Sequence, residues 1–204
     1  EIGFDLKETL AIVRRELDAL GIEYTEKFGK SSIVAIINPG KAFTIGIRAD
    51  MDGLPIQEQS NNPYPSKNPG KMHACGHDVH TANLLAVARQ LNDMKDQLRC
   101  TVKCLFTPAE EYTTPGCMLM AEDGVMDDIH MIVACHVDAA IPVGQIRVRE
   151  GGLNANSLGL YAEFFGKAAH AANQQTGVDA IRMAVEAYVA MELMVAREVA
   201  AKSP

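Results

Sequence analysis

The chain has 204 residues, of which 48% are hydrophobic and 22% are charged, and this suits one large domain or one domain with part of a second. Its formal net charge of −7 argues against nucleic acid or an anionic membrane as the main partner, because both require a basic face. No apolar run approaches the roughly 20 residues that a membrane-spanning helix needs.

The N-terminal sequence, EIGFDLKETL, lacks the basic and then apolar pattern of a signal peptide. The five cysteines are odd in number and do not have the spacing of a disulfide scaffold. Because disulfides persist in oxidising compartments, these features together predict a cytoplasmic protein with reduced thiols.

Helical and strand patterns alternate from the beginning of the chain. Residues 5–20 have apolar side chains in steps of three and four, which is typical of an amphipathic helix, and Gly21 is a suitable cap for its end. Two β-rich runs follow, 31–37 and 43–50. The sequence Asn-Pro-Gly-Lys between them is a turn signal, so we expect these two strands to form a hairpin.

The alternation continues in the middle of the chain. Residues 80–94 predict a helix, and 101–106 predict a buried strand. A short helix is expected over 116–122, followed by a second buried strand over 130–137. Elements in this order are typical of an α/β domain with a largely parallel sheet and helices on both faces.

The sequence MHACGHDVH, residues 72–80, concentrates side chains that bind transition metals. Its three histidines, Cys75 and Asp78 each offer a lone pair from nitrogen, thiolate or carboxylate oxygen. Gly76 allows a sharp bend of the backbone, so that Cys75 and His77 can converge on one point. An ordinary polar loop is the alternative, but the density of these residues favours a metal site.

Further acids and a histidine stand at the ends of the predicted strands. Asp50 and Asp52 end one strand, Glu110 and Glu111 follow the next, and His136 closes the last. Residues two apart on an extended chain point to the same side, so both aspartates can face one site. Because sites in open α/β sheets form beyond the carboxyl ends of the strands, we expect these groups to share one edge.

Each of these features has an ordinary alternative when it is taken alone. Adjacent glutamates such as Glu110 and Glu111 are more typical of a solvated face, and His136 fits a hydrogen-bonded polar residue. The ligand spacing excludes a zinc finger, which needs two close ligand pairs separated by a short loop. A nucleophilic Cys75 paired with His77 remains open, although the surrounding carboxylates favour a metal. Their shared position in the predicted scaffold favours one common site.

Four sequence motifs resemble those of the M20 metallopeptidase family: RADMDGLP (48–55), MHACGHDVHTA (72–82), PAEE (108–111) and the segment from ACHVD to PVG (134–144). More narrowly, they resemble its amidohydrolase branch, which includes hippurate hydrolases, auxin-conjugate hydrolases and other N-acyl-amino-acid amidohydrolases. The resemblance implies a zinc-peptidase-like three-layer α/β catalytic domain with a mixed, largely parallel sheet over residues 1–152. It also implies the beginning of an α+β, ferredoxin-like lid and dimerisation domain over 153–204.

The same resemblance implies a two-metal hydrolase that cleaves the amide bond between an acyl group and an amino acid. The implied metal ligands are Cys75, His77, Glu111 and His136. Glu110 would be the general base. Three aspartates would support the ligands from outside the metal sphere, namely Asp50, Asp52 and Asp78. A thiolate ligand favours zinc, and the mixed carboxylate and imidazole ligands also suit manganese, cobalt or nickel.

The last quarter of the chain has a different character. Residues 159–165 predict a strand, and a polar loop and a long helix follow. The loop sequence Gly-Lys-Ala-Ala-His170-Ala resembles the start of the family's lid domain, where a histidine reaches the substrate in the partner subunit's site of a homodimer. This sequence departs from that motif, because Ala168 and Ala169 replace a glycine pair and Gln174 replaces a proline. An ordinary loop position is therefore the alternative for His170.

Members of the family continue through the lid, return to the catalytic domain and end with a further metal-ligand histidine. This sequence ends at Pro204, within the implied lid, so we expect a partial chain. Two interpretations follow. In one, the chain belongs to an amidohydrolase whose partner is a small N-acyl amino acid. In the other, the chain as given is a catalytically incompetent module that binds a metal or a partner.

Overall fold

The computed structural model describes residues 1–152 and 159–198. The chain divides into two compact units, Glu1–Val143 and Gly144–Pro204, and each is described by itself. Residue 153, where the second domain is expected to begin, lies outside the described residues, so that boundary stays a prediction.

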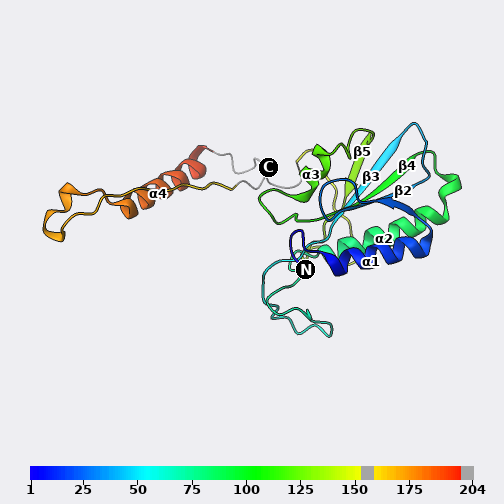
Figure 1. Cartoon of the computed structure of the whole chain (residues 1–204), viewed down its shortest axis with the longest axis horizontal. Coiled ribbons are helices and arrows are strands. Elements are labelled where there is room, and N and C mark those ends of the chain that lie inside the picture. The colour runs from blue at the N-terminus through cyan, green and yellow to red at the C-terminus, as the bar shows by residue number, and fades with distance from the viewer. Residues whose placement is uncertain (153–158, 199–204) are drawn as a thin grey trace. The chain divides into compact units, whose positions relative to one another are not determined.

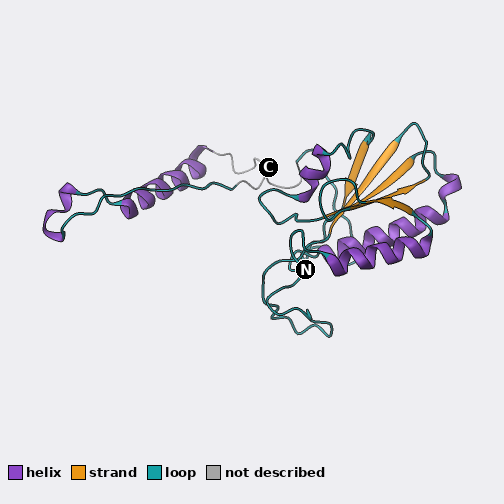
Figure 2. Ribbon diagram, viewed as in Figure 1, coloured by secondary structure: helices purple, strands orange, loops and turns teal. Residues whose placement is uncertain are grey.

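The first unit is built on one mixed sheet, whose strands are drawn in orange in Figure 2. Its five strands have the order β1-β2-β4-β3-β5. In chain order the strands are β1 (Glu23–Thr25), β2 (Ile33–Ile37), β3 (Thr44–Asp50), β4 (Thr101–Thr107) and β5 (Met131–Ala134). β3 pairs in parallel with both β4 and β5, whereas β2 pairs antiparallel with β1 and β4. The predicted α/β fold with a mixed sheet is confirmed.

The predicted hairpin of β2 and β3 is wrong, because β4 lies between these two strands. The expected turn is present, and Asn38 has the positive φ of 53° that such a turn requires. However, the side-chain amide of Asn38 donates hydrogen bonds to the carbonyl oxygens of Leu98 and Cys100, at 2.9 and 3.0 Å. The turn is thereby tied to the chain that enters β4. All residues of β4 are buried, and a strand buried on both faces belongs in the middle of a sheet.

Helices cover both faces of the sheet (Figure 1). α1 (Lys7–Leu20) and α2 (His77–Asp93) lie side by side on one face, whereas the shorter α3 (Gly116–Glu122) lies on the other. A 3₁₀ turn, Lys95–Gln97, follows α2. Gly21 ends α1 with a φ of 62°, the left-handed conformation that glycine adopts without strain. The expected cap and the three layers are therefore confirmed.

Alternating side chains of the strands fill the two core layers. Ile33 and Ile37 of β2 pack in the cluster that contains the buried residues of α1, whereas Val34 packs with Met120 of α3. This period of two follows from the pleat of a strand, which points successive side chains to opposite faces. Residues of β3 and β4 pack in these cores, and the candidate site is built at the ends of these strands.

β5 differs from the buried strand expected over 130–137. It covers only Met131–Ala134, and all of its residues are exposed. Its described partner is β3 alone, so β5 is an edge strand and lacks a second neighbour to cover it. His136 consequently lies in the irregular segment after the strand instead of closing it.

In the second unit, a 3₁₀ helix η2 (Ala171–Thr176) precedes the long helix α4 (Ala180–Glu198). The expected strand over 159–165 does not form. A strand needs a neighbour for its backbone hydrogen bonds, and the described residues of the second unit supply only the isolated bridge between Lys167 and Val178. Among the residues that the structure describes, none of the helices combines the length and apolar character that a membrane crossing requires.

Candidate metal centre

Four segments of the first unit bring acids, histidines and a cysteine together where β3 and β4 end. Three sets of side chains place one ligand atom each within 4.8 Å of one another: Cys75, His77 and His136; Asp50, His77 and His80; and His77, Glu110 and Glu111. His77 belongs to all three sets. The predicted convergence of the four predicted ligands and the general base around one edge is therefore present in the geometry.

His77 is the first residue of α2, and its side chain is buried. Nδ1 lies 3.4 Å from Asp52 Oδ1, and Nε2 lies 3.7 Å from Asp50 Oδ2 and 3.9 Å from Glu110 Oε2. Neither ring nitrogen has a well-formed hydrogen bond. Burial lowers the pKa of His77, but the carboxylates of Asp52, Asp50 and Glu110 outweigh this effect, so the pKa is raised. A buried polar atom without a partner costs free energy of folding, and a cation bound among these carboxylates would give a ring nitrogen of His77 a partner.

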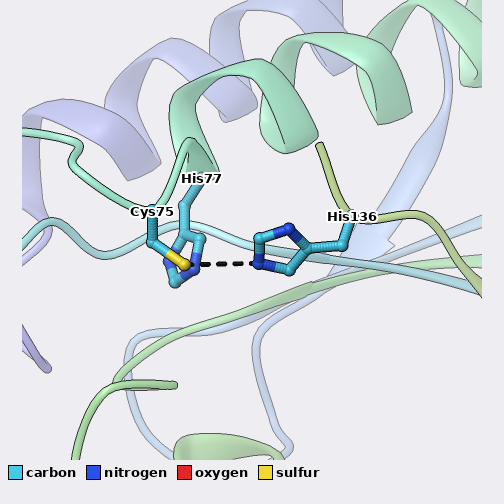
Figure 3. Close-up of side chains that lie close together, drawn as sticks. All are labelled: Cys75, His77 and His136. Atoms are coloured by element: carbon cyan, nitrogen blue, oxygen red, sulfur yellow. Dashed lines mark hydrogen bonds between the residues drawn. The ribbon is translucent and has the colours of Figure 1, made fainter. Parts of the chain in front are cut away.

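Cys75 and His136 face each other beside His77 (Figure 3). The distance between Cys75 Sγ and His136 Nε2 is 3.2 Å. The other ring nitrogen, Nδ1 of His136, is 2.6 Å from the carbonyl oxygen of Val137, to which it can only donate. In the neutral imidazole the proton is therefore on Nδ1, and Nε2 directs its lone pair toward Cys75. Gly76 has a φ of 87°, and this left-handed bend brings Cys75 and His77 together as the sequence predicts.

The thiol of Cys75 is poorly suited to act as a free nucleophile. Burial, a hydrogen bond with Glu111 and the negative charges of Glu111, Glu110 and Asp50 together raise its pKa to about 11. Such a thiol is protonated at neutral pH, whereas a cysteine nucleophile needs a lowered pKa. A bound divalent cation would instead lower the pKa of this thiol, because a thiol that coordinates a metal is deprotonated. The structure therefore argues against the pairing of Cys75 with His77 as a nucleophile and base.

Asp52 connects His77 to the turn that carries the two glutamates. Its carboxylate is buried and accepts hydrogen bonds from the backbone N–H groups of Glu110 and Glu111, at 2.9 and 3.4 Å. Burial raises the pKa of Asp52, but the nearby imidazole of His77 and the backbone hydrogen bonds from Glu110 and Glu111 together lower it below its ordinary value. Ala109, which precedes the glutamates, is buried with a positive φ of 53°. Asp52 thus fixes a strained turn at the edge of the site.

Asp50 lies between two cationic or donor groups. Its Oδ2 is 2.9 Å from Nη1 of Arg48, and its Oδ1 is 2.5 Å from Nδ1 of His80. Sequence reasoning missed Arg48. The available signal was its position two residues before Asp50 on the same strand, which places both side chains on one side.

Asp78 and His170 are the two other predicted site residues. Asp78 is exposed, and no hydrogen bond or ion pair in the described part of the chain involves its side chain. His170 belongs to the second unit, where its Nδ1 accepts a hydrogen bond from the backbone of Ala172 at 3.1 Å and caps η2. The supporting role of Asp78 and the substrate contact of His170 stay predictions. His73 has a buried Nδ1 without a partner, but it belongs to none of the three sets.

Comparisons with known proteins agree with this geometry. Residues 46–202 match the model of Peptidase family M20/M25/M40. An IAA-amino acid hydrolase of Arabidopsis thaliana (ILR1-like 5) is 38% identical over 97% of this chain and 45% of its own length. The N-acetyl-L-cysteine deacetylase of Bacillus subtilis is 38% identical over 98% of this chain and 48% of its own length. The N-acyl-L-amino acid amidohydrolase of Geobacillus stearothermophilus is 34% identical over 98% of this chain and 54% of its own length.

Solved structures of other proteins are similar to this chain as well. A dinuclear metal-binding peptidase of the M20 family from Bacillus subtilis is 40% identical and superposes with a TM-score of 0.71, over 75% of this chain and 43% of its own. A protein from methicillin-resistant Staphylococcus aureus is 29% identical, with a TM-score of 0.84 over 100% of this chain and 55% of its own. The chain spans about half the length of the curated relatives that it matches.

Proposed function

Because the chain belongs to peptidase family M20/M25/M40, we propose that the whole protein is a metal-dependent enzyme that hydrolyses the amide bond of N-acyl amino acids. The observation that carries this proposal is the buried imidazole of His77, whose unpartnered nitrogens face carboxylates and a cysteine–histidine pair. Three relatives at 34–38% identity support the substrate class, since they are named for the hydrolysis of N-acyl or amino acid conjugates.

The residues that would hold two divalent cations are Cys75, His77, Glu111 and His136. Their donor set of thiolate, imidazole and carboxylate suits zinc first, and manganese, cobalt or nickel as well. When bound, two such cations would polarise the scissile carbonyl and acidify a water molecule. Asp52 would hold Nδ1 of His77, which leaves Nε2 to face the carboxylates of Asp50 and the two glutamates.

Glu110 is the proposed general base. Its side chain is 40% exposed, so its carboxylate can reach both the substrate and a water molecule. Glu110 would take a proton from the water that attacks the amide carbon and deliver that proton to the amine nitrogen as the C–N bond breaks. Asp52 holds the backbone of both glutamates, so adjacent side chains can keep separate roles as base and ligand.

Substitution of a ligand tests the centre, and substitution of the base tests the chemistry. In the whole protein, we expect Cys75→Ala to lose at least one metal ion per protomer, measured by elemental analysis. We expect Glu110→Gln to keep its metal and to lose hydrolysis of hippurate-like substrates by about 100- to 10,000-fold.

Cys117→Ala in α3 is the matched control, because it also removes a partly buried thiol, but one that belongs to none of the three ligand sets. Unchanged metal content in Cys75→Ala would sink the ligand assignment. Stoichiometric metal without any hydrolysis by the wild type would favour a binding module instead.

The region from residue 153 onward is proposed to begin a lid domain through which the protein forms a homodimer. α4 supports this proposal, because Ile181, Val185 and Tyr188 are exposed apolar side chains on one helix. His170 would then contact the substrate in the partner subunit's site. Light scattering tests the dimer, and His170→Ala is expected to lower kcat/KM while the metal content is unchanged. A monomeric, active protein would contradict this arrangement.

A further inference from the structure

The segment that carries His136 rests on the first turn of α2 through its neighbour Val137. The backbone N–H of Val137 donates a hydrogen bond of 3.0 Å to Nε2 of His80. Val137 also packs against Gly76, since a Cβ added to this glycine would lie 2.4 Å from Val137 Cγ2. The pairing of β5 with β3 ends at Ala134, so these contacts hold the chain after the sheet pairing has stopped.

His80 is itself held by a chain of buried polar groups. Its Nε2 accepts the hydrogen bond from Val137 and must therefore be unprotonated, so the proton is on Nδ1. Nδ1 donates this proton to Asp50 at 2.5 Å, and Asp50 also receives the guanidinium of Arg48 at 2.9 Å. Arg48 is fixed in turn by a hydrogen bond of 2.9 Å from its Nε to Thr107 Oγ1. The orientation of the His80 ring is thereby set from the centre of the sheet.

The two buried histidines of this motif differ in their lone pairs. Both ring nitrogens of His80 are engaged, one with Asp50 and one with Val137, so no nitrogen is left for a cation. Both ring nitrogens of His77 are without a hydrogen-bond partner. The ring of His80 instead contacts the ring of His136, with 4.6 Å between the centroids.

We propose that His80 is a positioning residue that holds the backbone at Val137 and so keeps the imidazole of His136 beside Cys75 and His77. This inference rests on the proposed function, because it assigns His136 to the metal centre. It adds that the affinity of this centre for its cation depends on a hydrogen bond to a main-chain amide, made by a residue that does not touch the cation.

Three substitutions at one position separate the two hydrogen bonds of His80. His80→Gln keeps an acceptor near the place of Nε2 for the Val137 N–H, whereas His80→Asn keeps only a donor near Nδ1 for Asp50, and His80→Phe keeps neither. Loss of a group that orients a ligand typically costs about 10- to 100-fold in metal affinity. We therefore expect Co²⁺ to bind about 10- to 100-fold more weakly to the Asn and Phe variants, and to bind to the Gln variant more tightly than to these two.

The probe is Co²⁺ titrated into the metal-free whole protein, with absorption of the thiolate–cobalt bond as the signal of Cys75. Thr81→Val is the matched control, because it removes a buried hydrogen bond of 2.9 Å from the same turn of α2 to the backbone of Asp50 and leaves Val137 untouched. Its stability is expected to fall without a change in Co²⁺ affinity. Unfolding midpoints of the metal-free variants report on folding separately.

Two results would overturn the role of His80 while leaving the metal centre in place. In one, the Asn and Phe variants bind Co²⁺ as tightly as the wild type does, with the same spectrum. In the other, the Gln variant is as weak as the Asn variant, so that the Val137 hydrogen bond has no effect on affinity. A wild type without any thiolate–cobalt absorption would instead refute the proposed centre, and the role of His80 with it.

Discussion

Asp52→Asn tests whether one buried carboxylate holds the two glutamates of the site in place. Asp52 is 1% exposed, and its two oxygens accept the N–H groups of Glu110 and Glu111 at 2.9 and 3.4 Å. Asparagine has nearly the same shape but offers only one acceptor oxygen, so its NH₂ group faces one of these N–H donors. The substitution therefore removes the negative charge and one of the two hydrogen bonds without opening a cavity.

The size of the effect follows from these distances. A hydrogen bond to a charged group contributes about 1.5–3 kcal/mol, and a neutral one contributes about 0.5–1.5 kcal/mol. The bond to Glu111 is long and adds little, so the main loss is the change of the Glu110 bond from charged to neutral. We expect the free energy of unfolding to fall by about 1–2 kcal/mol, which is about 5- to 30-fold in the folding equilibrium. Metal affinity should fall by about 10-fold or more, because the turn that carries both glutamates is held more weakly.

Denaturant unfolding of the metal-free whole protein measures the stability, and elemental analysis after dialysis against dilute metal measures the affinity. Asp123→Asn is the matched control, because Asp123 also accepts a backbone N–H, from Gly29 at 2.6 Å, on the α3 side of the sheet. That variant should lose stability and keep its metal. If Asp52→Asn retained the metal affinity of the wild type, Asp52 would not be an anchor of the glutamate turn.

Two further predictions concern residues away from the ligands. Gly116→Ala is expected to destabilise the protein by about 1–3 kcal/mol, because an added Cβ would lie 2.5 Å from the carbonyl oxygen of Pro108, and chemical denaturation measures this loss. Burial raises the pKa of Cys104 from 9.0 to about 12, so the unfolded thiol ionises first and stability is lost as the pH rises between these values. The loss should be about 1.4 kcal/mol at pH 10 and absent from Cys104→Ala, and equal pH dependence in both proteins would contradict it.

Local patterns in the sequence were sufficient for most of the helices and strands. The helix before Gly21 and the short helix over 116–122 follow from apolar periodicity and capping, and the structure confirms both. The hairpin failed because the Asn38 turn signal reports only that the chain reverses, and not which strand then lies beside it. β4 took that place, where all of its residues are buried. Pairing of this kind depends on the whole sheet, so no window of sequence contains it.

The exposure of β5 was missed for a related reason. The sequence HMIVACHV is apolar enough for a buried strand, but its burial depends on neighbours that the segment does not encode. The same dependence hid the position of His136. A strand that continued to residue 137 would have fixed this histidine by its pairing, whereas the observed segment is held by α2.

The two histidines of α2 show where sequence reasoning about ligands must stop. His77 and His80 are three residues apart, a spacing that places both on one face of a helix, and both are buried. Residue type and spacing therefore favour them equally as ligands. The two histidines are distinguished by partners that are remote in the sequence. Both ring nitrogens of His80 are hydrogen-bonded, one to Asp50 and the other to Val137, which is 57 residues away. Of the two, only His77 keeps ring nitrogens without a hydrogen-bond partner, and it is therefore the one that we propose as a metal ligand.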